Sequence, residues 1–231
     1  MINVIPYTSL HVSKHDWLES RFHFSFAEYH NPEKMHFGVL RVMNDDVIAP
    51  HRGFEMHHHR DMEIFTYVLE GELSHEDSMG HKETLYAGDI QYLSAGTGIY
   101  HSEKNESAKP VRLIQTWILP HTKGLPPRYG SYKRDKALRH NRWQHLFGAD
   151  NGGAVIGWYQ DANAYAIEQD KEVNSTFILD KRRQAYLKVM EGSIVLNGMP
   201  LAFGDSAEIV DTIIEIEATS DAHVLLIEMS I

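Results

Sequence analysis

The stretch GFEMHHHRDMEI contains three consecutive histidines, His57, His58 and His59. Successive side chains of an extended strand point to opposite faces, so His57 and His59 share one face while His58 points to the other. The stretch GIYHSEKN repeats this two-residue spacing with His101 and Glu103. If neighbouring antiparallel strands carry the two pairs, three imidazoles and one carboxylate meet around one point.

This set of side chains has the chemistry of a metal site. Imidazole and carboxylate are borderline-to-hard ligands, and the chain has no Cys that could add a thiolate. Iron(II), manganese, nickel, copper and zinc all suit such ligands. The absence of Cys also excludes a disulfide framework and a thiolate nucleophile. The competing interpretation is that both pairs are solvent-facing residues of ordinary strands.

The elements that must hold these pairs are short runs separated by Gly, Asn or Asp turns, such as EIFTYVLEGEL, KETLYAGDIQYLS, VRLIQTWIL and AYLKVMEGSIVLNG. β-branched and aromatic residues dominate them, which is typical of an all-β sandwich or barrel. Helical candidates are few, and the clearest is a short one within KALRHNRWQHLFG. The sequence therefore predicts an all-β protein with few short helices.

A sequence pattern that occurs twice, here called the internal echo, indicates two related β modules. YVLEG is followed by a Gly-Asp pair at residues 88–89, and KVMEG is followed by one at residues 204–205. Each pattern reads as a strand, a turn, a second strand and a turn that opens a third. Such patterns also recur by coincidence in unrelated β proteins. The least strand-like stretches lie between the two echoes, so we predict domains at residues 1–130 and 131–231.

Composition limits the class of protein. The chain has 231 residues, 42% of them apolar, which is enough for a substantial core. A formal charge of −10, without a block of Lys and Arg, disfavours direct binding to nucleic acid. No signal-peptide pattern and no run of bilayer-spanning length is present, so we expect a cytoplasmic protein without a membrane partner.

Longer stretches carry a family resemblance. GFEMHHHRDMEIFTYVLEG resembles the first cupin motif, and GDIQYLSAGTGIYHSEKN resembles the second. With RFHFSFAEY, HEDSMGH and SAGTGIYHSE, the chain resembles the pirin family of bicupins, which includes bacterial quercetin 2,3-dioxygenases. The resemblance is specific over residues 15–120 and rests on length and module order beyond residue 130. It implies a cupin-type β-barrel in each domain.

The resemblance also implies a ligand set. Matched position by position, the metal ligands are His57, His59, His101 and Glu103, and the expected metal is Fe(II). Glu63 stands where many cupins place a carboxylate ligand, whereas pirins use the Glu two residues after the histidine of the second motif. Glu63 then becomes a candidate for orienting an imidazole by accepting its free N–H.

The other histidines are expected to lie outside the site. Pirins commonly have Pro between the first two ligand histidines, and His58 stands there in this chain. Strand alternation turns His58 away from the metal, so it should tune the site at most. We expect most of the remaining histidines, such as His51, His75 and His81, to be solvated surface residues.

The second module has lost any such site. When the two repeats are aligned on their glycines, no histidine occupies a position equivalent to one of the four ligands. Those positions hold Ile178, Asp180, Glu217 and Thr219. We therefore expect one divalent metal per chain, in the domain at residues 1–130.

The function implied by the resemblance is cleavage of a flavonol such as quercetin with dioxygen. Hydroxyl and carbonyl oxygens of the substrate would replace water on the metal, and Glu103 would take the hydroxyl proton. The flavonol heterocycle would open with loss of carbon monoxide. Phe54, Met56 and Trp117 are candidate walls for a flat aromatic substrate, but aromatic residues are spread along the chain, which favours ordinary core or rim positions for them.

Two alternatives use similar ligands. Some pirin relatives are regarded as non-catalytic, iron-dependent regulators that bind a partner protein, and these need the same four ligands. A zinc cupin isomerase or a storage module also uses the same ligand types. The residues of the motifs favour pirins over sugar isomerases. The sequence alone does not separate an enzyme from a regulator.

Overall fold

The computed structural model describes residues 1–150 and 152–231, and strands dominate it. The described helices are a 3-10 turn, η1 (Tyr7–Ser9), and one turn of α-helix, α1 (Lys136–Arg139). The all-β prediction is therefore confirmed, although the predicted helix covers only KALR, and QHLFGA forms a strand instead. None of the described helices has the length and apolar character needed to cross a bilayer.

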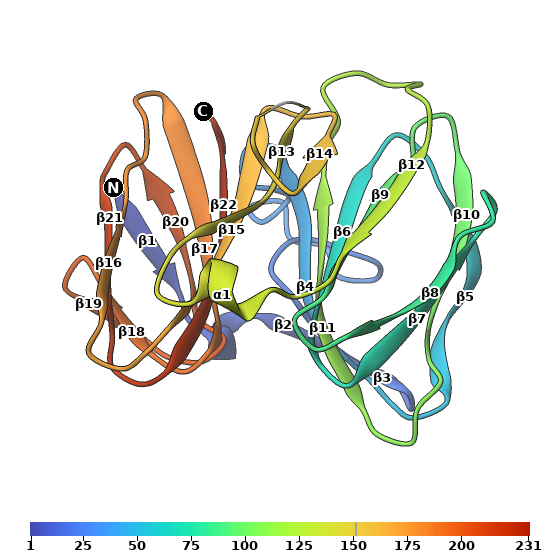
Figure 1. Cartoon of the computed structure of the whole chain (residues 1–231), viewed down its shortest axis with the longest axis horizontal. Helices are drawn as coiled ribbons and strands as arrows, with labels where there is room; N and C mark the ends of the chain where they lie inside the picture. Colours follow the sequence, from blue (N-terminus) through green and yellow to red (C-terminus); the bar gives the residue numbers. More distant parts are fainter. Residues whose placement is uncertain (151) are drawn as a thin grey trace. The chain divides into compact units, whose positions relative to one another are not determined.

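The chain folds into two compact units. We call the first the N-terminal module; it comprises His11–Arg134 with Trp158–Gln160. The C-terminal module comprises Asp135–Gly157 and Asp161–Ile231 with Met1–Leu10. Figure 1 shows that each module is built from facing sheets.

The N-terminal module has a seven-stranded sheet, ordered β12-β9-β6-β11-β4-β3-β2, and a four-stranded sheet, ordered β5-β10-β7-β8. All pairings within them are antiparallel. The strands are β2 (His11–Lys14), β3 (Leu18–Phe22), β4 (Leu40–Ile48), β5 (Arg52–His59), β6 (Glu63–Glu70), β7 (Glu72–Asp77), β8 (Lys82–Tyr86), β9 (Ile90–Ser94), β10 (Ile99–Asn105), β11 (Val111–Ile118) and β12 (Arg128–Tyr132).

The C-terminal module repeats this plan with a seven-stranded sheet, ordered β1-β20-β17-β22-β15-β13-β14, and a four-stranded sheet, ordered β16-β21-β18-β19. Its strands are β1 (Ile2–Ile5), β13 (Gln144–Ala149), β14 (Ile156–Trp158), β15 (Ala162–Gln169), β16 (Asn174–Phe177), β17 (Arg183–Glu191), β18 (Ile194–Leu196), β19 (Met199–Leu201), β20 (Ser206–Val210), β21 (Ile214–Ala218) and β22 (Ala222–Ser230).

The echo in the sequence corresponds to repeated turns. Gly71 and Gly192 follow equivalent strands and have φ values of 76° and 73°, in the left-handed region that favours glycine. Asp89 and Asp205 open equivalent strands, and each accepts a hydrogen bond at 2.9 Å from the backbone N–H three residues earlier. The same local chemistry therefore sets the same turns in both modules.

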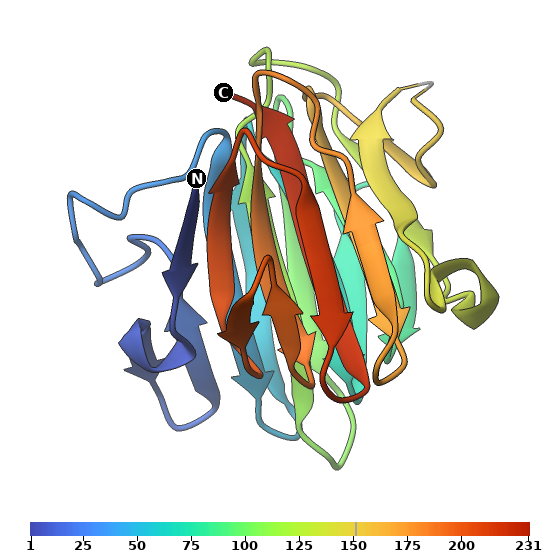
Figure 2. The ribbon, with the colours of Figure 1, turned by 90° about the vertical axis from the view of Figure 1, so that its left-hand side faces the viewer.

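The first strand of the chain completes the C-terminal module. β1 pairs with β20 at the edge of the seven-stranded sheet, where Figure 2 shows it in blue beside the red and orange strands. In the N-terminal module β12 occupies the corresponding edge beside β9. The connection after β1 is fixed by Tyr7, whose backbone N–H donates to Asp205 Oδ1 at 2.8 Å.

The interior of the C-terminal module is apolar. Along β21, Ile214, Ile216 and Ala218 are buried in the core, while Glu217 is exposed. Glu217 pairs with Asn174 on β16. Ile178 is 73% exposed and lies beyond the end of β16. Apolar side chains of β21 thus point into the interior of this module.

Asp46 on β4 is a buried carboxyl that should make stability depend on pH. Burial raises its pKa from 3.8 to about 7, against a hydrogen bond from Ser20. The folded state therefore holds a proton that the unfolded state releases above its own lower pKa. This contribution to the free energy of unfolding is complete below pH 3.8 and is lost as the pH rises through about 7.

We expect Asp46→Asn to remove this dependence. Between pH 5 and pH 7 the wild type should lose stability relative to the variant by on the order of 1 kcal/mol per pH unit. Urea unfolding of both proteins at pH 5, 6, 7 and 8 measures the difference. A constant difference across this range would show that Asp46 does not bind a proton more tightly in the folded state.

Candidate metal centre

The strands β5 and β10 lie side by side and bring the two ligand pairs together. In their antiparallel register His57 is opposite His101, and His59 is opposite Ile99. Alternation places His57 and His59 on the face that His101 also occupies, so the predicted convergence of three imidazoles is present. His58 is exposed and packs on the other face against Tyr100, with ring centroids 4.8 Å apart.

The three imidazoles form a compact group. Each offers one ring nitrogen, and these nitrogens all lie within 4.8 Å of one another. The ring centroids are 4.4 Å apart for His57 and His101, 4.7 Å for His57 and His59, and 4.9 Å for His59 and His101. Among the described residues, this is the group of three or more His, Cys, Asp or Glu that could hold a metal ion.

The protonation of these rings suits metal binding. Burial and the neighbouring imidazoles lower the pKa of His59 and of His101 to about 3, so both rings are neutral near pH 7. His57 Nδ1 lies 2.7 Å from the Glu55 carbonyl oxygen; donation to that oxygen leaves Nε2 with a free lone pair. Both ring nitrogens of His101 are buried without a described hydrogen-bond partner. A divalent metal would give one of these two buried nitrogens a partner.

Glu103 lies on the same strand as His101 and is 2% exposed. Its Oε1 accepts hydrogen bonds from Thr66, at 2.9 Å, and from Gln91, and its Oε2 accepts one from Gln115 at 2.7 Å. The carboxylate is thus held in place by three side chains from β6, β9 and β11. It lies outside the group of nitrogens within 4.8 Å, and its role as a ligand stays a prediction.

Gln91 and Gln115 were not identified from the sequence. Each is a polar residue in the middle of an apolar run, in IQYLS and VRLIQTWIL. A buried amide needs partners, because an unpaired polar group in a core costs about 1–3 kcal/mol. A Gln in such a run was therefore the available signal that something polar lies inside the barrel.

Glu63 has a different role from the one expected. It is 1% exposed, and its Oε1 accepts a hydrogen bond from Ser94 at 2.7 Å. Its Oε2 accepts from the Tyr92 hydroxyl and, at 3.2 Å, from the backbone N–H of Tyr159. None of the described imidazoles donates to Glu63. The hypothesis that it orients a ligand histidine is wrong, and it instead anchors residues 158–160 to the N-terminal module.

A cavity of about 860 Å³ adjoins the centre at His57. Trp17, Phe54 and Met56 line it, together with the polar side chains of Lys104 and Asn105. Phe54 packs edge-on against Trp17, with ring centroids 5.1 Å apart. Two of the three candidate wall residues thus line this cavity.

The third candidate, Trp117, lies on β11 outside the lining of this cavity. Its ring stands edge-on to His59 at 4.9 Å and edge-on to Phe26 at 5.3 Å. Trp117 therefore packs against a candidate ligand.

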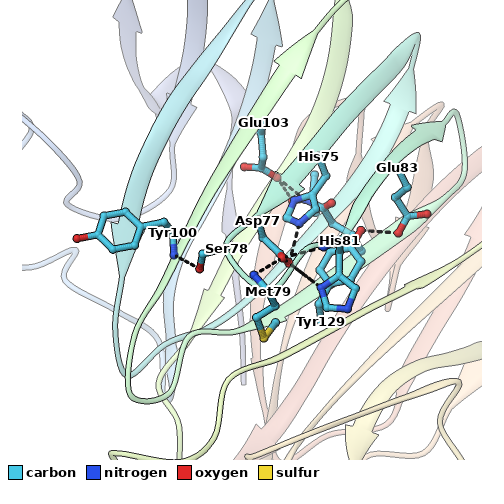
Figure 3. Close-up of polar contacts among 11 residues, drawn as sticks. His75, Asp77, Ser78, Met79, His81, Glu83, Tyr100, Glu103 and Tyr129 are labelled. Atoms are coloured by element: carbon cyan, nitrogen blue, oxygen red, sulfur yellow. Dashed lines mark hydrogen bonds and ion pairs between the residues drawn. The ribbon is translucent and has the colours of Figure 1, made fainter.

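His75 is buried rather than solvated, which corrects the expectation for this residue, whereas His51 and His81 are exposed. His75 Nε2 lies 3.3 Å from Asp77 Oδ2, and Figure 3 shows His75 between Asp77 and Glu103. Burial alone would raise the pKa of Asp77, but hydrogen bonds from His81, His75 and Met79 hold it below the usual value. The sequence carried a signal here too, since His75 and Asp77 have the spacing of residues on one strand face.

Comparisons with known proteins agree with this geometry. The family model named Pirin matches residues 6–118, and the model of the quercetinase C-terminal cupin domain matches residues 148–229. A pirin-like protein of Caulobacter vibrioides is 39% identical, with 99% of each chain covered. The chain belongs to the pirin family. The resemblance inferred from its motifs is thereby confirmed.

Two other pirin relatives bear on function. A protein of Escherichia coli strain K12 named quercetin 2,3-dioxygenase is 41% identical, with 94% of each chain covered. The crystal structure of the bacterial pirin YhhW from Escherichia coli in complex with nickel(II) has a TM-score of 0.93 and 38% identity, and covers 100% of this chain and 99% of that one. Together with the three imidazoles, this relative supports a divalent metal in the pirin described here.

The strand geometry makes opposite predictions for adjacent histidines. His57→Ala should reduce nickel retained after dialysis by more than the roughly 10–100-fold that loss of a supporting partner costs. His58→Ala should keep nickel near the wild-type level, because its ring lies on the other face. Elemental analysis measures the metal, and circular dichroism checks that both variants keep the β fold. Equal metal loss in the two variants would contradict the assignment of faces.

Proposed function

We propose that this pirin is a metal-dependent dioxygenase that cleaves a flavonol such as quercetin. The observation that carries the proposal is the convergence of three imidazoles beside a buried carboxylate and an accessible cavity. The names of its relatives as quercetin 2,3-dioxygenases support the reaction class.

The proposed ligands are His57, His59, His101 and Glu103, and the proposed metal is Fe(II). These residues offer nitrogen and oxygen only, which also suits nickel, manganese, copper and zinc. We place the centre in the domain at residues 1–130 and assign no metal ligand to residues 131–231. When bound, the ion would supply Lewis acidity and one-electron chemistry to a coordinated substrate.

The proposed catalytic residue is Glu103, as the acceptor of a substrate hydroxyl proton. Its carboxylate is fixed by donors from Thr66, Gln91 and Gln115, so it keeps its direction without solvent. A base held in this way needs no reorganisation when a proton arrives. The three donors also compensate the cost of burying its charge.

The proposed substrate is a flat aromatic molecule in the cavity beside His57. Trp17 and Phe54 supply an aromatic wall, and Met56 supplies an adaptable apolar contact. A volume of about 860 Å³ lies within the usual range for small-molecule pockets, about 300–1,000 Å³. Dioxygen is the proposed co-substrate.

The direct test is turnover of quercetin. Protein reconstituted with iron(II) under anaerobic conditions should consume oxygen and bleach the flavonol absorbance when quercetin and air are admitted. His101→Ala, treated in parallel, should do neither, because it lacks one of the three imidazoles. Glu103→Gln should lower the rate roughly 10²–10⁴-fold, the usual contribution of a positioned base.

Stoichiometric iron without oxygen uptake in the wild type would contradict the dioxygenase. That result would favour the iron-dependent regulator that binds a partner protein, which needs the same ligands. Turnover that survives in His101→Ala would place the reaction away from the proposed centre.

A further inference from the structure

The three candidate imidazoles differ in what fixes the direction of each ring. A histidine that binds a metal usually donates its second ring N–H to a carboxylate, a carbonyl or water. His57 fits this pattern, because its Nδ1 lies 2.7 Å from the Glu55 carbonyl oxygen. The ring of His101 makes no described hydrogen bond, but His101 is 1% exposed and enclosed on every side. His59 is only partly buried, and none of the described residues makes a hydrogen bond with its ring, so its direction depends on packing.

The packing around His59 consists of other rings. Within the part of the chain that the structure describes, its imidazole contacts His57 at 4.7 Å, His101 at 4.9 Å and Trp117 at 4.9 Å, centroid to centroid. His57 and His101 are proposed ligands and lie with His59 on β5 and β10. Trp117 comes instead from β11, in the facing sheet, and its ring is edge-on to His59 at an interplanar angle of 82°. Of these three rings, Trp117 is therefore the one that can hold His59 from outside the ligand set.

Trp117 is itself held in place. Its strand, β11, is the middle strand of the seven-stranded sheet. The indole packs against an apolar cluster that includes Ile64 and Ile99, and it meets Phe26 edge-on at 5.3 Å. Phe26 belongs to a tight turn, in which it exchanges backbone hydrogen bonds of 3.1 Å and 2.9 Å with Tyr29. Contacts from the sheet and from this turn leave the indole little freedom to move.

We propose that Trp117 is a positioning residue of the metal centre, and that its indole holds the His59 imidazole in the direction in which a ring nitrogen reaches the metal. Trp117 does by contact what the Glu55 carbonyl does for His57 by a hydrogen bond. This inference rests on the metal ligands proposed above. It adds that affinity for the metal depends on an aromatic residue that offers the ion no ligand atom.

The test measures the nickel(II) affinity of the full chain by competition with a coloured chelator. Trp117→Leu keeps an apolar side chain but removes the ring that holds His59. It should weaken nickel binding about 10–100-fold, the usual cost of losing a partner that orients a ligand. Trp117→Phe keeps an aromatic ring at this position and should restore most of the affinity.

A double-mutant cycle separates positioning from a general effect on the fold. In the His59→Ala background there is no imidazole for Trp117 to hold, so adding Trp117→Leu should change the nickel affinity less than about twofold. As a matched control, Trp143→Leu removes a partly buried tryptophan of the C-terminal module that packs edge-on against Phe177 at 5.6 Å. This variant should lower the midpoint of urea unfolding and keep the nickel affinity of the wild type.

Equal nickel affinity of the wild type and Trp117→Leu would overturn the proposal. An equal loss with and without the His59 imidazole would also overturn it, because Trp117 would then act on another part of the module. If Trp117→Leu does not fold, Trp117→Met takes its place with the same expectation, since an unbranched side chain adapts to irregular space.

The outcomes for the proposed function are distinct from these. Failure of quercetin turnover would contradict the dioxygenase alone, since nickel affinity is measured without turnover. A wild type that does not bind nickel would overturn the proposed centre and, with it, the role of Trp117.

Discussion

The register between β5 and β10 is the constraint on which the candidate centre depends. A slip of one residue would turn every side chain of one strand to the opposite face and would separate His57 from His101. The register shifts between His101 and Glu103, which are opposite His57 and Phe54. One extra residue on β5 lies at this bulge, so Phe54 and His57, three positions apart, can both face inward. The bulge thus aims an aromatic side chain and a candidate ligand into the same interior.

Burying polar groups in the interior of the N-terminal module costs free energy, and hydrogen bonds between those groups offset this cost. Thr66, Gln91 and Gln115 come from three strands of the seven-stranded sheet and converge on the Glu103 carboxylate. The corresponding interior of the C-terminal module holds Ile214, Ile216 and Ala218 instead. The two modules share strand order and turn chemistry, so the difference between them lies in side chains rather than in the backbone plan.

Much of this arrangement could be predicted from the sequence because strand alternation is a local rule. The alternation indicated that His57 and His59 share a face and that His58 does not. Motifs predicted the all-β fold and the pirin family. Partners distant in sequence were not predictable in this way. The pairing of β1 with β20 joins residues near opposite ends of the chain, and the donors on Glu63 come from Ser94, Tyr92 and Tyr159.

Burial was also hard to infer for histidines. His75 and His81 belong to the same HEDSMGH stretch, yet only His75 is buried, because it lies within β7 opposite Glu103. Strand lengths also differ between the two modules. β16 ends at Phe177, so the equivalent of β5 is shorter there. Strand lengths and registers depend on tertiary pairing, which a single strand does not encode.

We propose that three imidazoles and Glu103 bind one metal ion per chain. Anomalous diffraction at the nickel edge, from crystals of the nickel(II)-loaded protein, tests it most directly. We expect one peak per chain, about 2.0–2.2 Å from a nitrogen of each of His57, His59 and His101 and from an oxygen of Glu103. A peak bound by Glu63, a peak in the C-terminal module, or no peak among the three imidazoles would contradict it.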